Sequence, residues 1–246
     1  MGNLTNKVAA VFAAAGDIAG AVAGALKAHG AIVYSATRTD ADAMNEMEID
    51  TFLKNVVAEH GRLDVVFNGI GTTYEEMGGR PPTTVATLAQ FMAPMQKICG
   101  SQFLTSRVAA RYMIETGSQG TILLLTAALS RSKLPNLAGI TAASAAVEGM
   151  TRVMAAEWGG HGIKVTCICP GALAETRRIN GWIQGAAKEY NIPIEQLIAQ
   201  YQAFDILKGN PTLKQVGETA AFLASDAGAA FNSHIVDVDG GKLNIL

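Results

Sequence analysis

The chain has 246 residues, of which 49% are hydrophobic and 16% are charged, and its formal net charge is −2. This length suits one large α/β domain with a single core, and the apolar content excludes a disordered chain. A charge so near neutral gives no electrostatic basis for binding nucleic acid or an anionic membrane surface, so we expect neither partner. No uncharged apolar run reaches about 18 residues, the length that a spanning helix needs.

Three cysteines, Cys99, Cys167 and Cys169, are an odd number in a chain too large to need disulfides for folding. This favours a reducing, cytoplasmic location. Cys167 and Cys169 alternate along an expected strand and so share one of its faces. Since no second Cys or His pair stands at ligand spacing, we expect no metal site.

Apolar runs alternate with helical patterns along the chain. Strands are expected at residues 8–14, 31–36, 64–68, 122–125, 163–169 and 235–238. Helices are expected at residues 18–29, 51–60, 102–115 and 213–224, and a further long helix ends near Trp158. This order predicts one α/β domain over residues 1–246, a doubly wound parallel sheet flanked by helices, with its ligand crevice at the carboxyl ends of the strands.

Short segments in a fixed order carry a resemblance to a known family along nearly the whole chain. They are GRLDVV at 61–66 before Asn68, AAVEGMTR at 145–152, HGIKV at 161–165, PG at 170–171, FLASD at 222–226 and VDGG at 238–241. With these segments the chain resembles the short-chain dehydrogenases/reductases. The resemblance implies an NAD(P)-binding Rossmann fold, a homo-oligomer (dimer or tetramer), and oxidoreductase activity on a carbonyl/alcohol pair.

The family's glycine-rich cofactor turn, Thr-Gly-x-x-x-Gly-x-Gly, falls on residues 12–19 (FAAAGDIA). By the resemblance, the positions that would contact the cofactor here are Ala13, Gly16, Asp17 and Ile18. Glycine gives a pyrophosphate access to bare amides at the helix N-terminus, whereas Asp17 brings a negative charge that can cap those amides and compete with it. The alternative is a slightly shifted loop, supported by Gly16 and Gly20, that still accepts a dinucleotide.

Three further positions match cofactor-contacting residues of the family: Arg38, Asn68 and Gly69. Arg38 stands where many members place an arginine that meets the 2′-phosphate of NADP, although a solvated strand-end arginine fits equally well. Residues 38–64 leave room for only a vestigial helix or strand before Thr51, in the region that builds the family's adenine pocket. The family thus implies NAD(P) as the cofactor, whereas these residues disfavour its binding. We therefore assign no cofactor from the sequence.

The catalytic register follows from residues 145–149, which in the family come directly after Tyr-x-x-x-Lys. It places Ile140 at the tyrosine and Ser144 at the lysine, and the strand-end serine of the family falls on Ala127. Carbonyl reduction by hydride needs a proton donor beside the developing alkoxide, and a phenol serves only when a nearby ammonium lowers its pKa. None of these three side chains meets that need, so we expect no intact catalytic set.

Other side chains could replace this set. The remaining hydroxyls are Thr126, at the end of the same strand, and Tyr74, in the loop after the third strand; each is also a common structural residue at such places. Residues 175–204 form a polar, partly helical excursion that the family uses as a lid. The apolar residues of this excursion either favour a small apolar ligand or pack on the domain. They are Trp182, Ile183, Tyr190, Ile194 and Leu197.

Small residues at helical spacing on the long helix, Ala142, Ala143, Ala146 and Gly149, allow another helix to approach closely. In the family this helix forms a subunit interface.

Three hypotheses on function therefore stand. The protein is a homologue without the family's hydride chemistry, a pseudoenzyme or a differently working enzyme; or it is an active NAD(P)(H)-dependent oxidoreductase with a displaced catalytic set; or it is a non-catalytic binding or hetero-oligomer partner subunit.

Overall fold

The computed structural model describes residues 3–202, 206–207 and 211–241. Its described part contains a six-stranded sheet in the order β2-β1-β3-β4-β5-β6, with every neighbouring pair parallel. The strands are β1 (Val8–Phe12), β2 (Ile32–Ala36), β3 (Val65–Asn68), β4 (Thr121–Leu125), β5 (Lys164–Pro170) and β6 (Ile235–Val238). The chain crosses from β2 over β1 to β3, which confirms the predicted doubly wound, parallel α/β fold.

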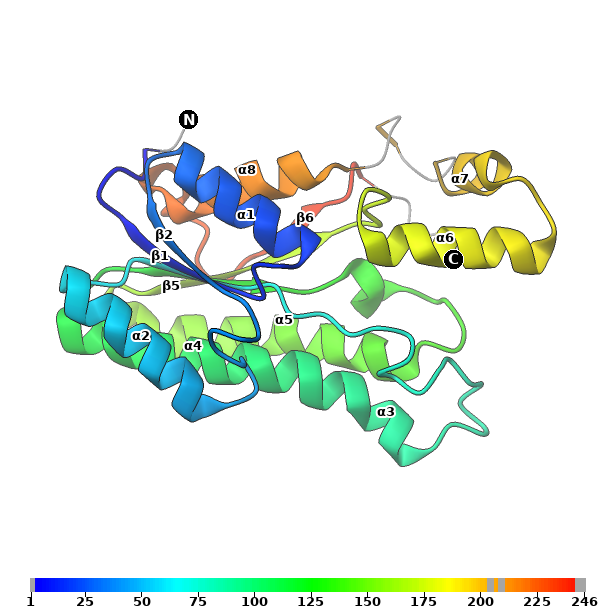
Figure 1. Cartoon of the computed structure of the whole chain (residues 1–246), viewed down its shortest axis with the longest axis horizontal. Coiled ribbons are helices and arrows are strands. Elements are labelled where there is room, and N and C mark those ends of the chain that lie inside the picture. The colour runs from blue at the N-terminus through cyan, green and yellow to red at the C-terminus, as the bar shows by residue number, and fades with distance from the viewer. Residues whose placement is uncertain (1–2, 203–205, 208–210, 242–246) are drawn as a thin grey trace.

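Helices cover both faces of the sheet (Figure 1). One face carries α1 (Asp17–Ala28) and α8 (Leu213–Ala224), and the other carries α2 (Glu46–His60), α4 (Gly100–Thr116) and α5 (Ala138–Trp158). The short helix α3 (Leu88–Pro94) runs into α4 through a π-helical turn, η1 (Met95–Cys99), and the 3₁₀ turns are η2 (Ala128–Arg131), η3 (Gly159–His161) and η4 (Asp226–Gly228). The described helices include none long and apolar enough to cross a membrane.

The excursion predicted at residues 175–204 contains two helices, α6 (Arg177–Tyr190) and α7 (Ile194–Gln202). They lie beyond the edge of the sheet at which the strands end (Figure 1). Phe204, the last residue of the predicted excursion, lies outside the described residues.

Burial on both faces explains why the strands are almost wholly apolar. In β1, Val8, Ala10 and Phe12 join the core beneath α2, α4 and α5, whereas Ala9 and Val11 join the core beneath α1 and α8. Every residue of β1, β3 and β4 is buried. A strand covered on both faces needs such a continuous apolar run rather than an alternating one.

One local prediction is wrong. The helix expected at 51–60 begins at Glu46, because Asn45 caps it by accepting a hydrogen bond from the Met47 amide at 3.1 Å. Its early start leaves a short loop after β2, which is one edge strand of the described sheet. Along α4, the stripe that faces the sheet is formed by Val108, Tyr112 and Met113, whereas Phe103 is exposed.

The helices α1 and α8 pack closely at Gly217. A Cβ atom on Gly217 would lie 2.7 Å from the carbonyl oxygen of Ala21 and 3.1 Å from the Cβ of Ala25. The Ala21 carbonyl belongs to the helix backbone, which cannot move out of a steric clash as a flexible side chain can. The absence of a side chain at Gly217 therefore sets the distance between these two helices.

We expect Gly217→Ala to lower the free energy of unfolding by about 1–3 kcal/mol, because the added methyl group meets the backbone of α1. Gly24→Ala is the matched control: Gly24 is exposed in α1, and nothing lies within 4 Å of its added Cβ. The control should raise stability by about 0.5–1 kcal/mol through helix propensity. Urea unfolding measures both, and an unchanged stability of Gly217→Ala would contradict the close packing.

Candidate functional site

The site residues predicted from the sequence follow the strands at one edge of the sheet. We call this the carboxyl-end edge: the segments that directly follow β1, β3 and β4, with the first turns of α1, α5 and α6. In Figure 1 the helices α6 and α7 lie beside it. Parallel strands end together, so residues distant in sequence meet here.

The turn between β1 and α1 keeps an unusual backbone. Ala13 has a φ of 58°, in the left-handed region that glycine adopts most readily, and the Gly16 amide donates to the Ala13 carbonyl at 2.8 Å. Gly16 is the N-cap of α1, with extended backbone and no side-chain cap. Ile18 and Ala19 follow in the first turn of α1 and pack toward the sheet.

Asp17 does not cap the helix, so that prediction is wrong. It is the first residue of α1, one position beyond the N-cap, and its carboxylate is used elsewhere. Oδ2 accepts a hydrogen bond from the Arg177 backbone amide at 2.8 Å, and Oδ1 accepts one from Arg177 Nε at 2.9 Å. Arg177 Nη2 also donates to the Ala15 carbonyl at 2.9 Å. We call these three contacts the Asp17–Arg177 clasp, which ties the start of α6 to the turn after β1.

Asn68 and Gly69 fix the end of β3. The Asn68 side chain donates to Thr105 Oγ1 at 3.1 Å and accepts from the Ile70 amide at 2.8 Å. A Cβ on Gly69 would lie 2.6 Å from the Cβ of Ala19, so this position tolerates no side chain beside α1. Both residues therefore have structural partners.

Arg38, at the end of β2, points into solvent. Its side chain is 87% exposed, and its ion pair with Asp42 has an Nε–Oδ2 distance of 3.7 Å. The structure agrees with the second interpretation of Arg38, a solvated arginine at the end of a strand. Since the pair is exposed, it contributes little stability.

The end of β4 faces the first turns of α5, as the register predicts. Ile140 and Ser144 are both buried, and Ile140 belongs to the hydrophobic core. Ser144 Oγ donates to the Ile140 carbonyl at 2.9 Å, and Thr126 Oγ1 donates to the Ser144 carbonyl at 3.1 Å. Each hydroxyl thus gives its proton to backbone. Ala127, next to Thr126, is half-buried and precedes η2.

Tyr74 lies apart from these hydroxyls, in the loop after β3. Its side chain is exposed, and the guanidinium carbon of Arg80 lies 5.9 Å from the centre of its ring. No hydrogen bond joins Tyr74 to Thr126 within the described part of the chain. The two candidate donors are therefore not brought together.

The apolar side chains of the excursion pack largely on one another. Ile183, Ala187 and Leu197 are buried in a small cluster shared by α6 and α7. Ile194 is exposed. The side chains of Trp182 and Tyr190 lie outside the described residues. This cluster agrees with the alternative that these residues serve packing.

The comparisons with known proteins agree over most of the chain. A family model described as enoyl-(acyl carrier protein) reductase matches residues 9–242. The chain is 30% identical over 258 residues to "Borneol dehydrogenase, mitochondrial" of Lavandula x intermedia, covering 97% of this chain and 91% of that protein. This chain belongs to the short-chain dehydrogenase/reductase family. It is also 30% identical over 203 residues to "(-)-isopiperitenol/(-)-carveol dehydrogenase, mitochondrial" of Mentha piperita, covering 81% of this chain and 72% of that protein.

Among solved structures, the crystal structure of levodione reductase has a TM-score of 0.83 to this short-chain dehydrogenase/reductase. The two are 23% identical, and the match covers 96% of this chain and 97% of that chain. At this identity the likeness shows the shared fold.

The sequence did not predict that Arg177 contacts the turn that corresponds to the family's cofactor turn. Arg177 was not singled out, because its partner Asp17 is 160 positions away in the sequence. One signal was present: Arg177 and Arg178 open α6 with no acidic residue in its first turn. Cations are unfavourable at the positive end of a helix dipole, so two arginines there indicate a partner elsewhere.

A polar group in the loop after β3 was also missed. Glu76 pairs with Lys97 and accepts a hydrogen bond from the Thr73 amide at 2.9 Å. Burial pushes the pKa of Glu76 upward, but the hydrogen bonds from Lys97 and Thr73 outweigh it and hold that pKa below its ordinary value. These contacts order the loop that carries Tyr74.

We expect Ala13→Gly to raise the free energy of unfolding by about 1 kcal/mol, because a left-handed φ strains alanine and not glycine. Thermal unfolding measures the gain. Ala14→Gly is the control at the next position, whose φ is not positive, and it should be neutral or destabilising. A loss of stability in Ala13→Gly would contradict the described turn.

Proposed function

We propose that this protein does not carry out its family's hydride transfer through a Ser/Tyr/Lys set, and that its carboxyl-end edge binds a small molecule instead. The observation that carries the proposal is the state of Ile140 and Ser144. One is an apolar core residue, and the other gives its only proton to a backbone carbonyl. Neither supplies the acidic proton or the cation that carbonyl reduction needs.

Weak binding of NAD(P), or none, is the second part of the proposal. The Asp17–Arg177 clasp supports it, because the Asp17 carboxylate already accepts hydrogen bonds from the Arg177 amide and guanidinium, and the guanidinium also donates to the Ala15 carbonyl beside the start of α1. A pyrophosphate approaching these amides would meet the Asp17 carboxylate. The short loop between β2 and α2 supports it further, since the family builds its adenine pocket in that region.

We expect no saturable micromolar binding when the protein is titrated with NADH or NADPH and nicotinamide fluorescence is followed. The double variant Asp17→Gly with Arg177→Ala removes the clasp and should bind more tightly than the wild type. A control variant, Lys188→Ala, removes a cation from the far end of α6 and should change nothing.

Micromolar binding by the wild type would contradict this proposal and favour the alternative, an active oxidoreductase with a displaced catalytic set. The names of the relatives, a borneol dehydrogenase and an isopiperitenol/carveol dehydrogenase, favour that alternative. They also suggest apolar alcohols as its substrates. Turnover of borneol or carveol that Tyr74→Phe abolishes would establish it.

We also propose that the protein is a homo-oligomer whose subunits meet through the outer faces of α4 and α5. Phe103 and Val153 are large apolar side chains exposed on these helices. Gly149 supports close approach, since nothing lies within 4 Å of an added Cβ there. Co-purification with a homologous second subunit would favour the hetero-oligomer alternative.

We expect Val153→Glu to lower the molecular mass of the particle in light scattering, because it places a charge in the proposed interface. Met47→Glu is the matched control, since Met47 is an exposed apolar residue of α2 on another surface. A multimer that Val153→Glu leaves intact would rule out this interface.

A cytoplasmic location remains part of the proposal. All three cysteines are free thiols, which suits a reducing compartment. Burial is the main cause that raises the pKa of Cys169, to about 12, so this thiol is unreactive. The names of two relatives point instead to mitochondria.

A further inference from the structure

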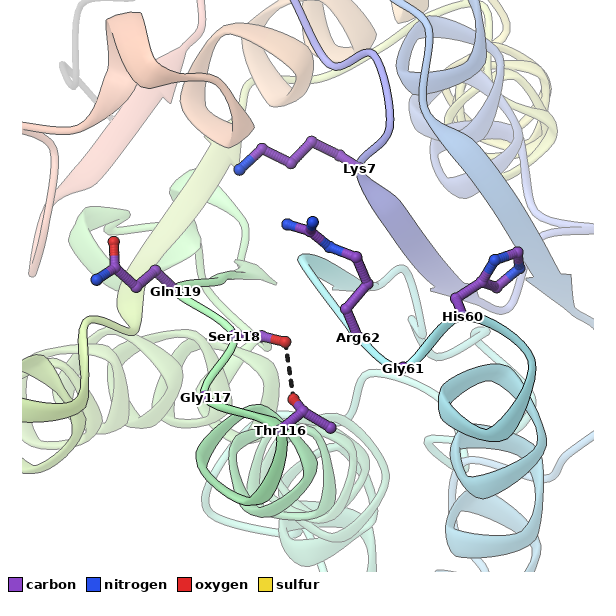
Figure 2. A pocket seen from close by; sticks show the side chains of 8 residues that line it. All are labelled: Lys7, His60, Gly61, Arg62, Thr116, Gly117, Ser118 and Gln119. Carbon is purple, nitrogen blue, oxygen red and sulfur yellow. Dashed lines mark hydrogen bonds between the residues drawn. The ribbon is translucent and has the colours of Figure 1, made fainter.

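A polar hollow lies at the opposite edge of the sheet, where the strands begin (Figure 2). Its volume is about 540 Å³, which is within the range of small-molecule sites. Three segments line it: Lys7 before β1, residues 60–62 at the end of α2, and residues 116–119 between α4 and β4. We call it the amino-end hollow, and it shares no residue with the carboxyl-end edge.

One buried carboxylate organises the charges around this hollow. Asp64 accepts hydrogen bonds from Arg62 Nε at 2.8 Å, from Arg62 Nη2 at 2.5 Å and from the Val8 amide at 2.8 Å. Its side chain is 1% exposed. The Asp64 oxygens are thus occupied by Arg62 and by the backbone of β1, and Arg62 Nη1 donates to no other residue in the part of the chain that the structure describes.

Lys7 has no comparable partner. Its side chain is only 29% exposed, and its Nζ lies 3.9 Å from Asp64 Oδ1, too far for a hydrogen bond. Within the described residues, its ammonium donates no hydrogen bond. This partly buried ammonium is therefore available to donate hydrogen bonds to an anion in the hollow. Figure 2 shows Lys7 and Arg62 extending from different segments toward the middle of the same space.

A third cation, Lys164, adds to the local charge. Its Nζ donates to the carbonyls of Gly228 and Leu223. Burial is the main reason that the pKa of Lys164 falls to about 8; Asp226 opposes the shift, and the charge of Lys7 adds to it. Cations and carboxylates are thus balanced around the hollow, since Glu59 Oε1 also lies 3.6 Å from Nε2 of the lining His60. The cations differ in their partners: Arg62 and Lys164 donate hydrogen bonds to acceptors, whereas Lys7 donates none within the described residues.

We propose that the amino-end hollow binds a small phosphate-bearing molecule, with Lys7 and Arg62 Nη1 as its donors. Phosphate carries a charge near −2 and several acceptor oxygens, so it can reach donors on separate segments at once. The hydroxyls of Thr116 and Ser118 have another role. Thr116 donates to the Tyr112 carbonyl, and Ser118 bonds Thr116 at 2.7 Å, which holds the loop on this side of the hollow.

Isothermal titration of the full chain with inorganic pyrophosphate, against chloride of equal ionic strength, tests the site. We expect saturable binding by the wild type and about tenfold weaker binding by Lys7→Gln, the loss expected from one charge-assisted hydrogen bond. Lys7→Arg should retain binding. Lys54→Gln, which removes an exposed cation from α2, is the matched control and should bind like the wild type.

Thermal unfolding provides the second readout and shows whether each variant is folded. Pyrophosphate should raise the midpoint of the wild type and of Lys54→Gln, and it should raise that of Lys7→Gln much less. The proposal is overturned if the wild type shows no saturable binding at millimolar pyrophosphate. It is also overturned if Lys7→Gln and Lys54→Gln bind equally, because the attraction would then be that of general surface charge.

Discussion

A parallel sheet must be covered on both faces, and this constraint leaves the ends of the strands as the places where charged side chains can meet next to the sheet. The strands β1, β3 and β4 contain no exposed residue, so chemistry has no place on the faces of the sheet. At one edge Asp64 joins β1 to Arg62. At the other, Asp17 joins α1 to Arg177. Each edge thus has an arginine–carboxylate pair that ties a strand end or helix start to another segment, and Arg131 with Asp237 forms a second such pair at the carboxyl ends of the strands.

The two pairs differ in strength for a physical reason. Asp64 is buried and holds three hydrogen bonds, so removing it would leave buried donors unsatisfied. Arg177 is 75% exposed, and exposed ion pairs contribute roughly 0–1 kcal/mol. A micromolar ligand gains about 8 kcal/mol on binding, so the clasp alone could not exclude a dinucleotide. The proposed loss of cofactor binding therefore depends also on the short loop between β2 and α2.

The sequence predicted all six strands. The central strands β1, β3 and β4 are buried on both faces, so they are continuous apolar runs that are easily recognised. It also placed Ile140, Ser144 and Thr126 in one region, since a helical turn separates the first two and a strand end precedes them. It could not predict the partner of Asp17, because Arg177 is 160 positions away in the sequence. Nor could it identify Lys7 as a cation short of acceptors, since that depends on which groups already occupy Asp64.

The departures from the family's pattern around the cofactor turn are not independent of one another. Ala19 stands at the third glycine of the turn, and Gly69 matches a cofactor-contacting position of the family. A side chain at position 69 would come within 2.6 Å of the Ala19 methyl group, so Ala19 requires glycine there. Ala13 likewise keeps a glycine-like φ of 58° without being glycine. The turn therefore combines a glycine-like backbone at Ala13 with a methyl group at Ala19, and the contact between Ala19 and position 69 makes one departure from the family's pattern depend on the other.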